Sequence, residues 1–234
     1  MQITPVQNFN LYYSTVKPKK EVSFTAHYDF GKVEEQVGDG VIYSRGRIHN
    51  YSALARDLQL FLEMPQLIEK KFPNGVKIYD YGCSAGYEPT SIVLGLHNHF
   101  SEEKVSNYTP IIARDCNPKI IKEAKNYRLR LNEDESYKLD FFENIKKEDY
   151  LITKRYDRTG QKIHDYTDKL KQEIIYEEGN LFDDLDDGKL SEEPCVVLLR
   201  NAWQFMTPMG RKQLADKLYS KLPPKSLVII GSCD

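Results

Sequence analysis

The stretch "KIYDYGCSAGYEPTS", residues 77–91, combines residue types that suit ligand binding. It begins as a short apolar strand, turns through Gly82 and Gly86, and then carries Glu88 where a helix should begin. Glycines let the backbone approach a ligand closely, and the helix that follows presents its N-terminal amides. The pattern therefore predicts a binding turn in which backbone groups contact the ligand.

Two phosphate-binding patterns are absent from this turn. The dinucleotide fingerprint G-x-G-x-x-G does not occur, and no Lys-Ser or Lys-Thr pair follows Gly86 as the G-x-x-x-x-G-K-[ST] motif requires. A pyrophosphate ligand is therefore not favoured.

Polar residues also end the later apolar runs. Asp115 ends "PIIARD", where an acid can accept hydrogen bonds from ribose hydroxyls, although it could instead cap the helix that begins near Pro118. Asn180 in "GNL" and Asn201 in "RNAW" follow two further strands, where an Asn could simply cap a turn. Because ligands bind beyond the carboxyl ends of parallel strands, we expect these residues to line one pocket. A nucleoside-like ligand without phosphate, such as S-adenosylmethionine, fits it.

The elements that must position these residues alternate between strands and helices. Short β-branched runs separated by helical patterns predict an α/β fold with a mostly parallel sheet and helices on both faces. The predicted strands are 76–81, 110–115, 173–182, 195–201 and 226–231, and the predicted helices are 51–71, 88–97, 118–131 and 208–222.

The chain divides by composition into two regions, and the second of them contains an insertion. We interpret residues 1–50 as an N-terminal extension, and residues 51–234 as one ligand-binding domain. Residues 132–172 are too many for an ordinary connection and too polar for core, so they form an inserted excursion rich in aromatic residues.

The totals exclude several other classes of protein. A formal net charge of -2 gives no basic field for nucleic acid, and no apolar run is long enough to span a membrane. The four cysteines form no CxxC pair, which favours reduced thiols in a cytoplasmic protein. His97 and His99 lack a nearby third ligand, so we expect surface residues and no metal site. The sequence specifies no oligomeric state.

The same residues resemble a known family. "YDYGCSAGYEPTS", "ARDCNPKIIKEAKNYRL", "IIYEEGNLFDDL" and "CVVLLRNAW" resemble, in order, the blocks of the CheR-type chemotaxis-receptor glutamate methyltransferases. The resemblance covers about residues 76–234, and its most specific part is the G-C-S-x-G-x-E-P-x-S block. It implies a Rossmann-like class I methyltransferase fold that uses S-adenosylmethionine to methylate a carboxylate.

The resemblance also implies roles for single residues. Glu88 would contact the methionine part of the cofactor and Asp115 its ribose. The set of implied cofactor-binding residues is Gly82, Ser84, Gly86, Glu88, Asp115, Asn180 and Leu181 (at the adenine), and Asn201 and Ala202 (at the pocket floor).

The acceptor side of the implied reaction needs little side-chain chemistry. A carboxylate acceptor is already ionised near neutral pH and needs no general base, but an arginine should hold it. Arg45 or Arg47 in "YSRGR" would serve, as expected from an arginine block of the family. Tyr87 replaces the first Glu of the family's G-E-E, and Phe205 stands where the family usually has a tyrosine that could orient the acceptor.

Three functions are compatible with these observations. The favoured one is methylation of a protein or small-molecule carboxylate. A second is methylation of another nucleophile, although "RNAW" differs from the N/D-P-P-Y signature of amine and amide methyltransferases. A third is a non-catalytic module that keeps the cofactor pocket.

Overall fold

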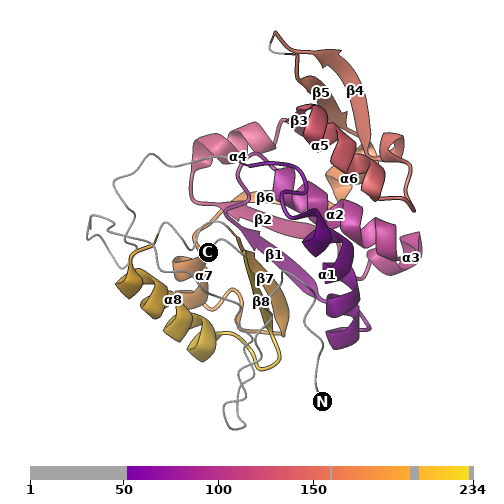
Figure 1. Ribbon diagram of the computed structural model, residues 1–234. Helices are drawn as coiled ribbons and strands as arrows, with labels where there is room; N and C mark the ends of the chain where they lie inside the picture. Colours follow the sequence, from indigo (N-terminus) through magenta and orange to yellow (C-terminus); the bar gives the residue numbers. More distant parts are fainter. Residues whose placement is uncertain (1–51, 159, 201–205, 232–234) are drawn as a thin grey trace. The chain divides into compact units, whose positions relative to one another are not determined.

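A computed structural model describes residues 52–158, 160–200 and 206–231 of the 234-residue chain (Figure 1). The chain forms two compact units, one spanning Asn50–Glu178 and the other including Gly179–Asp234. Arg45, Arg47, Asn201, Ala202 and Phe205 lie outside the described residues.

The first unit is built on three parallel strands. β1 (Lys77–Tyr81), β2 (Ile111–Asp115) and β6 (Ile174–Glu178) lie in the order β6-β2-β1. Ala113 pairs with Asp80 on one side and with Tyr176 on the other. All three strands run in the same direction, so their carboxyl ends meet at one edge of the sheet.

Four helices accompany these strands. They are α1 (Leu58–Lys71), α2 (Tyr87–His99), α3 (Glu102–Val105) and α4 (Pro118–Ala124). α1 packs against α2, and Gly95 makes the close approach possible because a Cβ there would collide with the backbone carbonyl of Phe61. The first of these helices begins later than predicted, since residues 54–57 form a turn.

A second, antiparallel sheet lies within the same unit. β3 (Arg128–Leu131), β4 (Leu151–Tyr156) and β5 (Lys162–Tyr166) have the order β3-β5-β4, as Figure 1 shows. The helices α5 (Glu133–Lys138) and α6 (Asp168–Gln172) and the short 3-10 helices η1 (Leu139–Phe141) and η2 (Lys147–Asp149) complete this region.

The predicted helix over 118–131 is wrong in its second half. α4 ends at Ala124, Tyr127 has a left-handed φ of 52°, and the chain continues as β3. The alternating sequence "RLRL" of β3 places its arginines outside and Leu129 and Leu131 in the core. Alternation with a period of two is the mark of a half-buried strand, and it prevails here over the helical pattern that precedes it.

The second unit contains a further parallel pair of strands. α7 (Leu181–Asp186), β7 (Cys195–Leu199), α8 (Pro208–Lys221) and β8 (Leu227–Ile230) follow one another, and β7 and β8 pair in parallel. Every residue of both strands is buried, as expected of parallel strands covered on both faces. The predicted strand over 173–182 is shorter than expected, because α7 begins at Leu181.

The predicted mostly parallel α/β architecture is therefore confirmed. Among the helices of the described ranges, none has the length and apolar character needed to cross a membrane.

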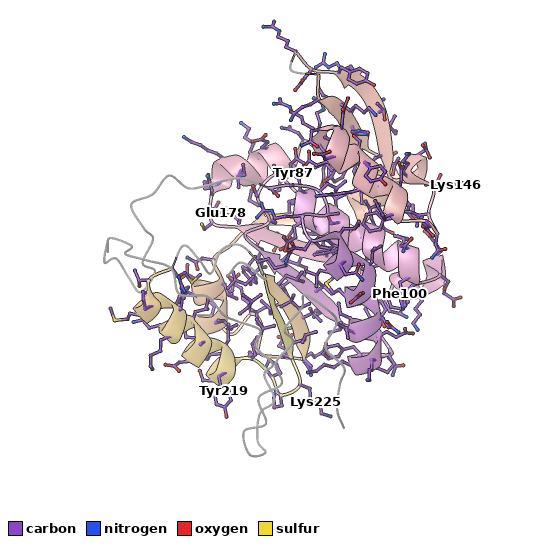
Figure 2. All side chains as sticks on the ribbon, in the orientation of Figure 1. Tyr87, Phe100, Lys146, Glu178, Tyr219 and Lys225 are labelled. Carbon is purple, nitrogen blue, oxygen red and sulfur yellow. The ribbon has the colours of Figure 1, made fainter. Side chains whose placement is uncertain are left out.

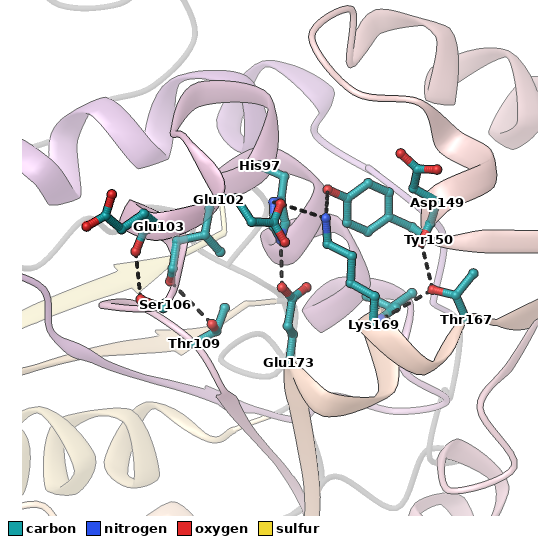
Figure 3. A network of polar contacts seen from close by, with 12 residues as sticks. His97, Glu102, Glu103, Ser106, Thr109, Asp149, Tyr150, Thr167, Lys169 and Glu173 are labelled. Carbon is teal, nitrogen blue, oxygen red and sulfur yellow. Dashed lines mark hydrogen bonds and ion pairs between the residues drawn. The ribbon is translucent and has the colours of Figure 1, made fainter.

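His97 is buried, which corrects the expectation of a surface residue. Its Nε2 lies 2.7 Å from Oε1 of Glu173, and its Nδ1 lies 3.4 Å from Oε2 of Glu102 (Figure 3). The amine of Lys169 lies 2.7 Å from the same Glu102 oxygen and 2.9 Å from the Tyr150 hydroxyl. The network joins the end of α2 to α3, α6 and the residue that precedes β6.

We predict that His97→Ala lowers the free energy of unfolding by about 2 kcal/mol, because it removes a hydrogen bond to Glu173 and leaves that carboxylate without the imidazole. Urea denaturation at pH 7 measures the loss. The matched control is His99→Ala, whose side chain is 30% exposed and should matter less. Equal losses for the two variants would contradict a special role for His97.

Candidate functional site

The turn between β1 and α2 has an unusual backbone. Gly82, Ser84 and Gly86 have positive φ angles of 81°, 50° and 95°. The N–H groups of Gly82 and Cys83 both donate to the carbonyl oxygen of Arg114, at 2.7 and 3.1 Å. The N–H of Gly86 donates to the carbonyl of Cys83 at 3.1 Å. The turn is therefore fastened to the end of β2 and closed on itself just before α2 begins.

The carboxylate of Asp115 joins this turn to the next one. One oxygen accepts the N–H of Ser84 at 3.1 Å, and the other accepts the N–H of Asn117 at 2.9 Å. Burial raises the pKa of Asp115, and the two hydrogen bonds lower it in part. The cap of α4 is supplied by Asn117, whose side chain accepts the N–H of Lys119, so the alternative of Asp115 as that cap is wrong.

Three carboxylates act on the same turn. Burial raises the pKa of the Cys83 thiol well above its usual value, and the negative charges of Asp80, Asp115 and Glu88 raise it further. A nearby like charge disfavours the charged form of a group and so raises the pKa of a thiol. These carboxylates therefore contribute negative charge at the turn, which favours a cationic ligand over a phosphate.

Asp80 was not among the residues predicted from the sequence. It lies in β1, is 1% exposed and contributes to the field at Cys83. The stretch "KIYDY" does indicate this residue, because one acid interrupts an otherwise apolar strand. Acids are almost never fully buried without a specific reason, so such a residue at the rim of a predicted site is a candidate.

Gly86 packs against two buried tyrosines, Tyr166 and Tyr176. The Tyr166 hydroxyl donates to the Gly86 carbonyl oxygen at 3.1 Å and lies 3.1 Å from the Tyr176 hydroxyl. A Cβ on Gly86 would collide with the Tyr176 hydroxyl oxygen and lie 3.0 Å from that of Tyr166. Both the positive φ and the lack of space therefore require glycine at this position.

The structure brings together part of the predicted site. Gly82, Ser84 and Gly86 form one turn, to which Asp115 bonds directly, and Glu88 lies in the first turn of α2. Asn180 and Leu181 belong to the other unit, where the Asn180 side chain caps α7 by accepting the N–H of Phe182 at 3.0 Å. The other predicted site residues lie outside the described ranges, and they are Arg45, Arg47, Asn201, Ala202 and Phe205.

These features define an α/β domain in which a glycine turn with nearby carboxylates follows the first strand. Residues 52–234 match the family described as "CheR methyltransferase, SAM binding domain". The chain belongs to this family, and the resemblance inferred from its motifs is confirmed. The match also confirms S-adenosylmethionine as the cofactor of the domain.

Similar proteins were found among curated sequences and solved structures. A "Chemotaxis protein methyltransferase" from Borreliella burgdorferi is 25% identical over 171 residues, which are 72% of this chain and 56% of that protein. The chain therefore spans little more than half the length of this relative. The rRNA methyltransferase aviRa from Streptomyces viridochromogenes has a TM-score of 0.44 at 15% identity, covering 79% of this chain and 76% of that one. A SAM-dependent methyltransferase from Agrobacterium tumefaciens has a TM-score of 0.37 at 11% identity, covering 96% and 59%.

We predict that Gly86→Ala lowers the free energy of unfolding by about 3 kcal/mol. The alanine would have to adopt a positive φ, and its Cβ would clash with the hydroxyl groups of the buried tyrosines. The control is Gly160→Ala, which has a comparable φ of 83° with nothing within 4 Å of the added Cβ. That variant should lose only about 1 kcal/mol. Thermal unfolding of both variants separates the steric effect from the backbone effect, and equal losses would contradict the close packing at Gly86.

Proposed function

We propose that this protein is an S-adenosylmethionine-dependent methyltransferase that O-methylates a carboxylate. The observation that carries the proposal is the convergence of Asp80, Glu88 and Asp115 on the turn that follows β1. Family membership supports the same conclusion, because the matched region is described as a SAM-binding domain of methyltransferases.

The residues of the turn fit this cofactor. S-adenosylmethionine carries an ammonium, a sulfonium and one carboxylate but no phosphate, so its net charge is positive and carboxylates suit its cationic groups. The backbone of Gly82 is exposed and has a positive φ, so a ligand can approach it closely. When bound, the cofactor supplies an activated methyl group to a nucleophile.

Several residues at this turn have proposed roles in binding S-adenosylmethionine. Glu88, at the start of α2, meets the cationic end of the cofactor. Asp115 accepts the ribose hydroxyls with lone pairs left over from its two backbone hydrogen bonds. Gly82 contributes exposed backbone, and Ser84 and Gly86 shape the turn through their positive φ angles. The roles of Asn180, Leu181, Asn201 and Ala202 stay predictions from the sequence.

The protein contributes alignment and exclusion of water to the reaction. A carboxylate acceptor has a reference pKa of about 4.3 and attacks in its ionised form, so no side chain has to remove a proton. Holding the acceptor in line with the methyl group supplies most of the rate. The protonated, buried thiol of Cys83 is no nucleophile under these conditions, in agreement with this scheme.

The acceptor is proposed to be a carboxylate on a protein, with a small acid as the alternative. Membership of a family whose described relative is a "Chemotaxis protein methyltransferase" supports a protein acceptor. Arg45 and Arg47 are the proposed holders of the acceptor, and Phe205 its proposed neighbour. We place the activity in the cytoplasm, which the free thiols of Cys83, Cys116 and Cys195 support.

We predict that Glu88→Gln weakens binding of S-adenosylmethionine about tenfold or more, since a charge-assisted contact is lost. Isothermal titration calorimetry with S-adenosylmethionine and S-adenosylhomocysteine measures the effect. Equal weakening of both ligands places the carboxylate at the shared ammonium, whereas selective weakening of S-adenosylmethionine places it at the sulfonium.

The matched control for this titration is Glu103→Gln, which removes one negative charge at an exposed position of α3 in the same unit. Its affinity should equal that of the wild type. Folded wild-type protein that binds neither ligand would overturn the proposed function, and a Glu88→Gln variant with unchanged affinity would overturn the role of Glu88 alone.

We predict that methyl groups transferred from labelled S-adenosylmethionine to protein in a lysate of the source organism are released as methanol by mild alkali. Carboxyl methyl esters hydrolyse under these conditions, whereas N-methyl groups do not. Alkali-stable label would favour a different nucleophile. Cofactor binding without any transfer would favour a non-catalytic module.

A further inference from the structure

A buried chain of hydroxyl groups lies beneath the cofactor turn. Tyr176 lies in β6 of the parallel sheet, and Tyr166 ends β5 of the antiparallel sheet. Both side chains are at most 3% exposed, and burial raises the pKa of Tyr166 to about 12. Both hydroxyls are therefore protonated at any physiological pH, and each has one proton to donate.

The direction of these hydrogen bonds follows from the acceptor at the end of the chain. The Gly86 carbonyl can only accept, and the Tyr166 hydroxyl lies 3.1 Å from it and 2.5 Å from the Thr90 hydroxyl. Tyr166 therefore donates to this carbonyl either directly or through the Thr90 hydroxyl. The proton of Tyr176 then points to the oxygen of Tyr166. Gly86 also accepts the N–H and the hydroxyl of Thr90, at 3.2 and 2.8 Å, but both of these come from α2 itself. Tyr166 is thus the side chain from another element that holds the Gly86 carbonyl, directly or through the Thr90 hydroxyl.

The orientation of this carbonyl matters because of peptide geometry. The Gly86 C=O and the Tyr87 N–H share one planar peptide group and point in opposite directions. The Tyr87 N–H is the first amide of α2 and has no partner within the helix. Whatever fixes the Gly86 carbonyl therefore also aims a backbone donor at the space in front of the turn.

A second contact fastens the next residue to the same antiparallel sheet. The Tyr87 hydroxyl donates to the carbonyl of Arg130 at 2.9 Å and accepts the N–H of Arg130 at 3.2 Å. Figure 2 labels Tyr87 at the start of α2. Two consecutive residues, Gly86 and Tyr87, are thus held by strands β5 and β3.

We propose that Tyr166 is a positioning residue for S-adenosylmethionine, through which the antiparallel sheet sets the geometry of the glycine turn. The proposal rests on the proposed function of that turn. Tyr166 does not touch the cofactor. It acts through the Gly86 carbonyl, so its loss should change cofactor affinity beyond any effect on folding.

The test is the affinity of S-adenosylhomocysteine for Tyr166→Phe, measured by calorimetry well below the unfolding temperature. We expect the Kd to rise about fivefold, the fold-change that corresponds to one lost neutral hydrogen bond. With lysate protein as the methyl acceptor, the same variant should raise KM for S-adenosylmethionine while the rate at saturating S-adenosylmethionine stays nearly constant.

Two variants separate positioning from stability. Tyr108→Phe removes another buried tyrosine hydroxyl, which donates to the Phe72 carbonyl at 2.8 Å away from the turn. It should lower the unfolding temperature and leave affinity unchanged. The double variant Tyr166→Phe with Tyr176→Phe removes the hydroxyl that the single variant leaves unpaired, so it should regain stability and keep the weaker affinity.

The outcomes distinguish this inference from the proposed function. Failure of the wild type to bind refutes the proposed function. Wild-type binding with unchanged affinity in Tyr166→Phe refutes the positioning role and leaves the proposed function intact. Affinity that recovers together with stability in the double variant also refutes it, because the effect would then follow from destabilisation.

Discussion

The structure of the site depends on one carboxylate held between two backbone N–H groups. Asp115 accepts the amide of Ser84 from the turn after β1 and the amide of Asn117 from the turn after β2. A bidentate carboxylate of this kind fixes two loops relative to each other at the cost of burying a charge. The strand ends are thereby locked at the edge of the sheet where ligands bind in parallel α/β folds.

Three carboxylates near one turn explain the kind of ligand that the turn suits. Asp80, Glu88 and Asp115 all act on Cys83, which lies inside the turn. Negative charge attracts a nearby cation and repels an anion. The three carboxylates therefore favour a cationic cofactor over a phosphate ligand at this turn.

The antiparallel sheet explains a departure from the family sequence. Tyr87 replaces an acid of the family pattern, and its hydroxyl bonds to both backbone groups of Arg130 in β3. Together with the contact from Tyr166 to Gly86, this side chain ties the start of α2 to a region that composition alone marks only as an excursion. The antiparallel sheet therefore helps to hold the turn in place.

The sequence by itself determined the parallel strands, most helices and the residues of the turn, because these follow from local hydrophobic periodicity and from glycine and proline positions. The tertiary structure decided the burial of His97, the strand at 128–131 and the tyrosine contacts with Gly86. These depend on partners far apart in the chain, as Tyr166 and Gly86 are, and one sequence does not record such pairings. The field at Cys83 is of the same kind, since Asp80, Glu88 and Asp115 come from three different elements that only folding brings together.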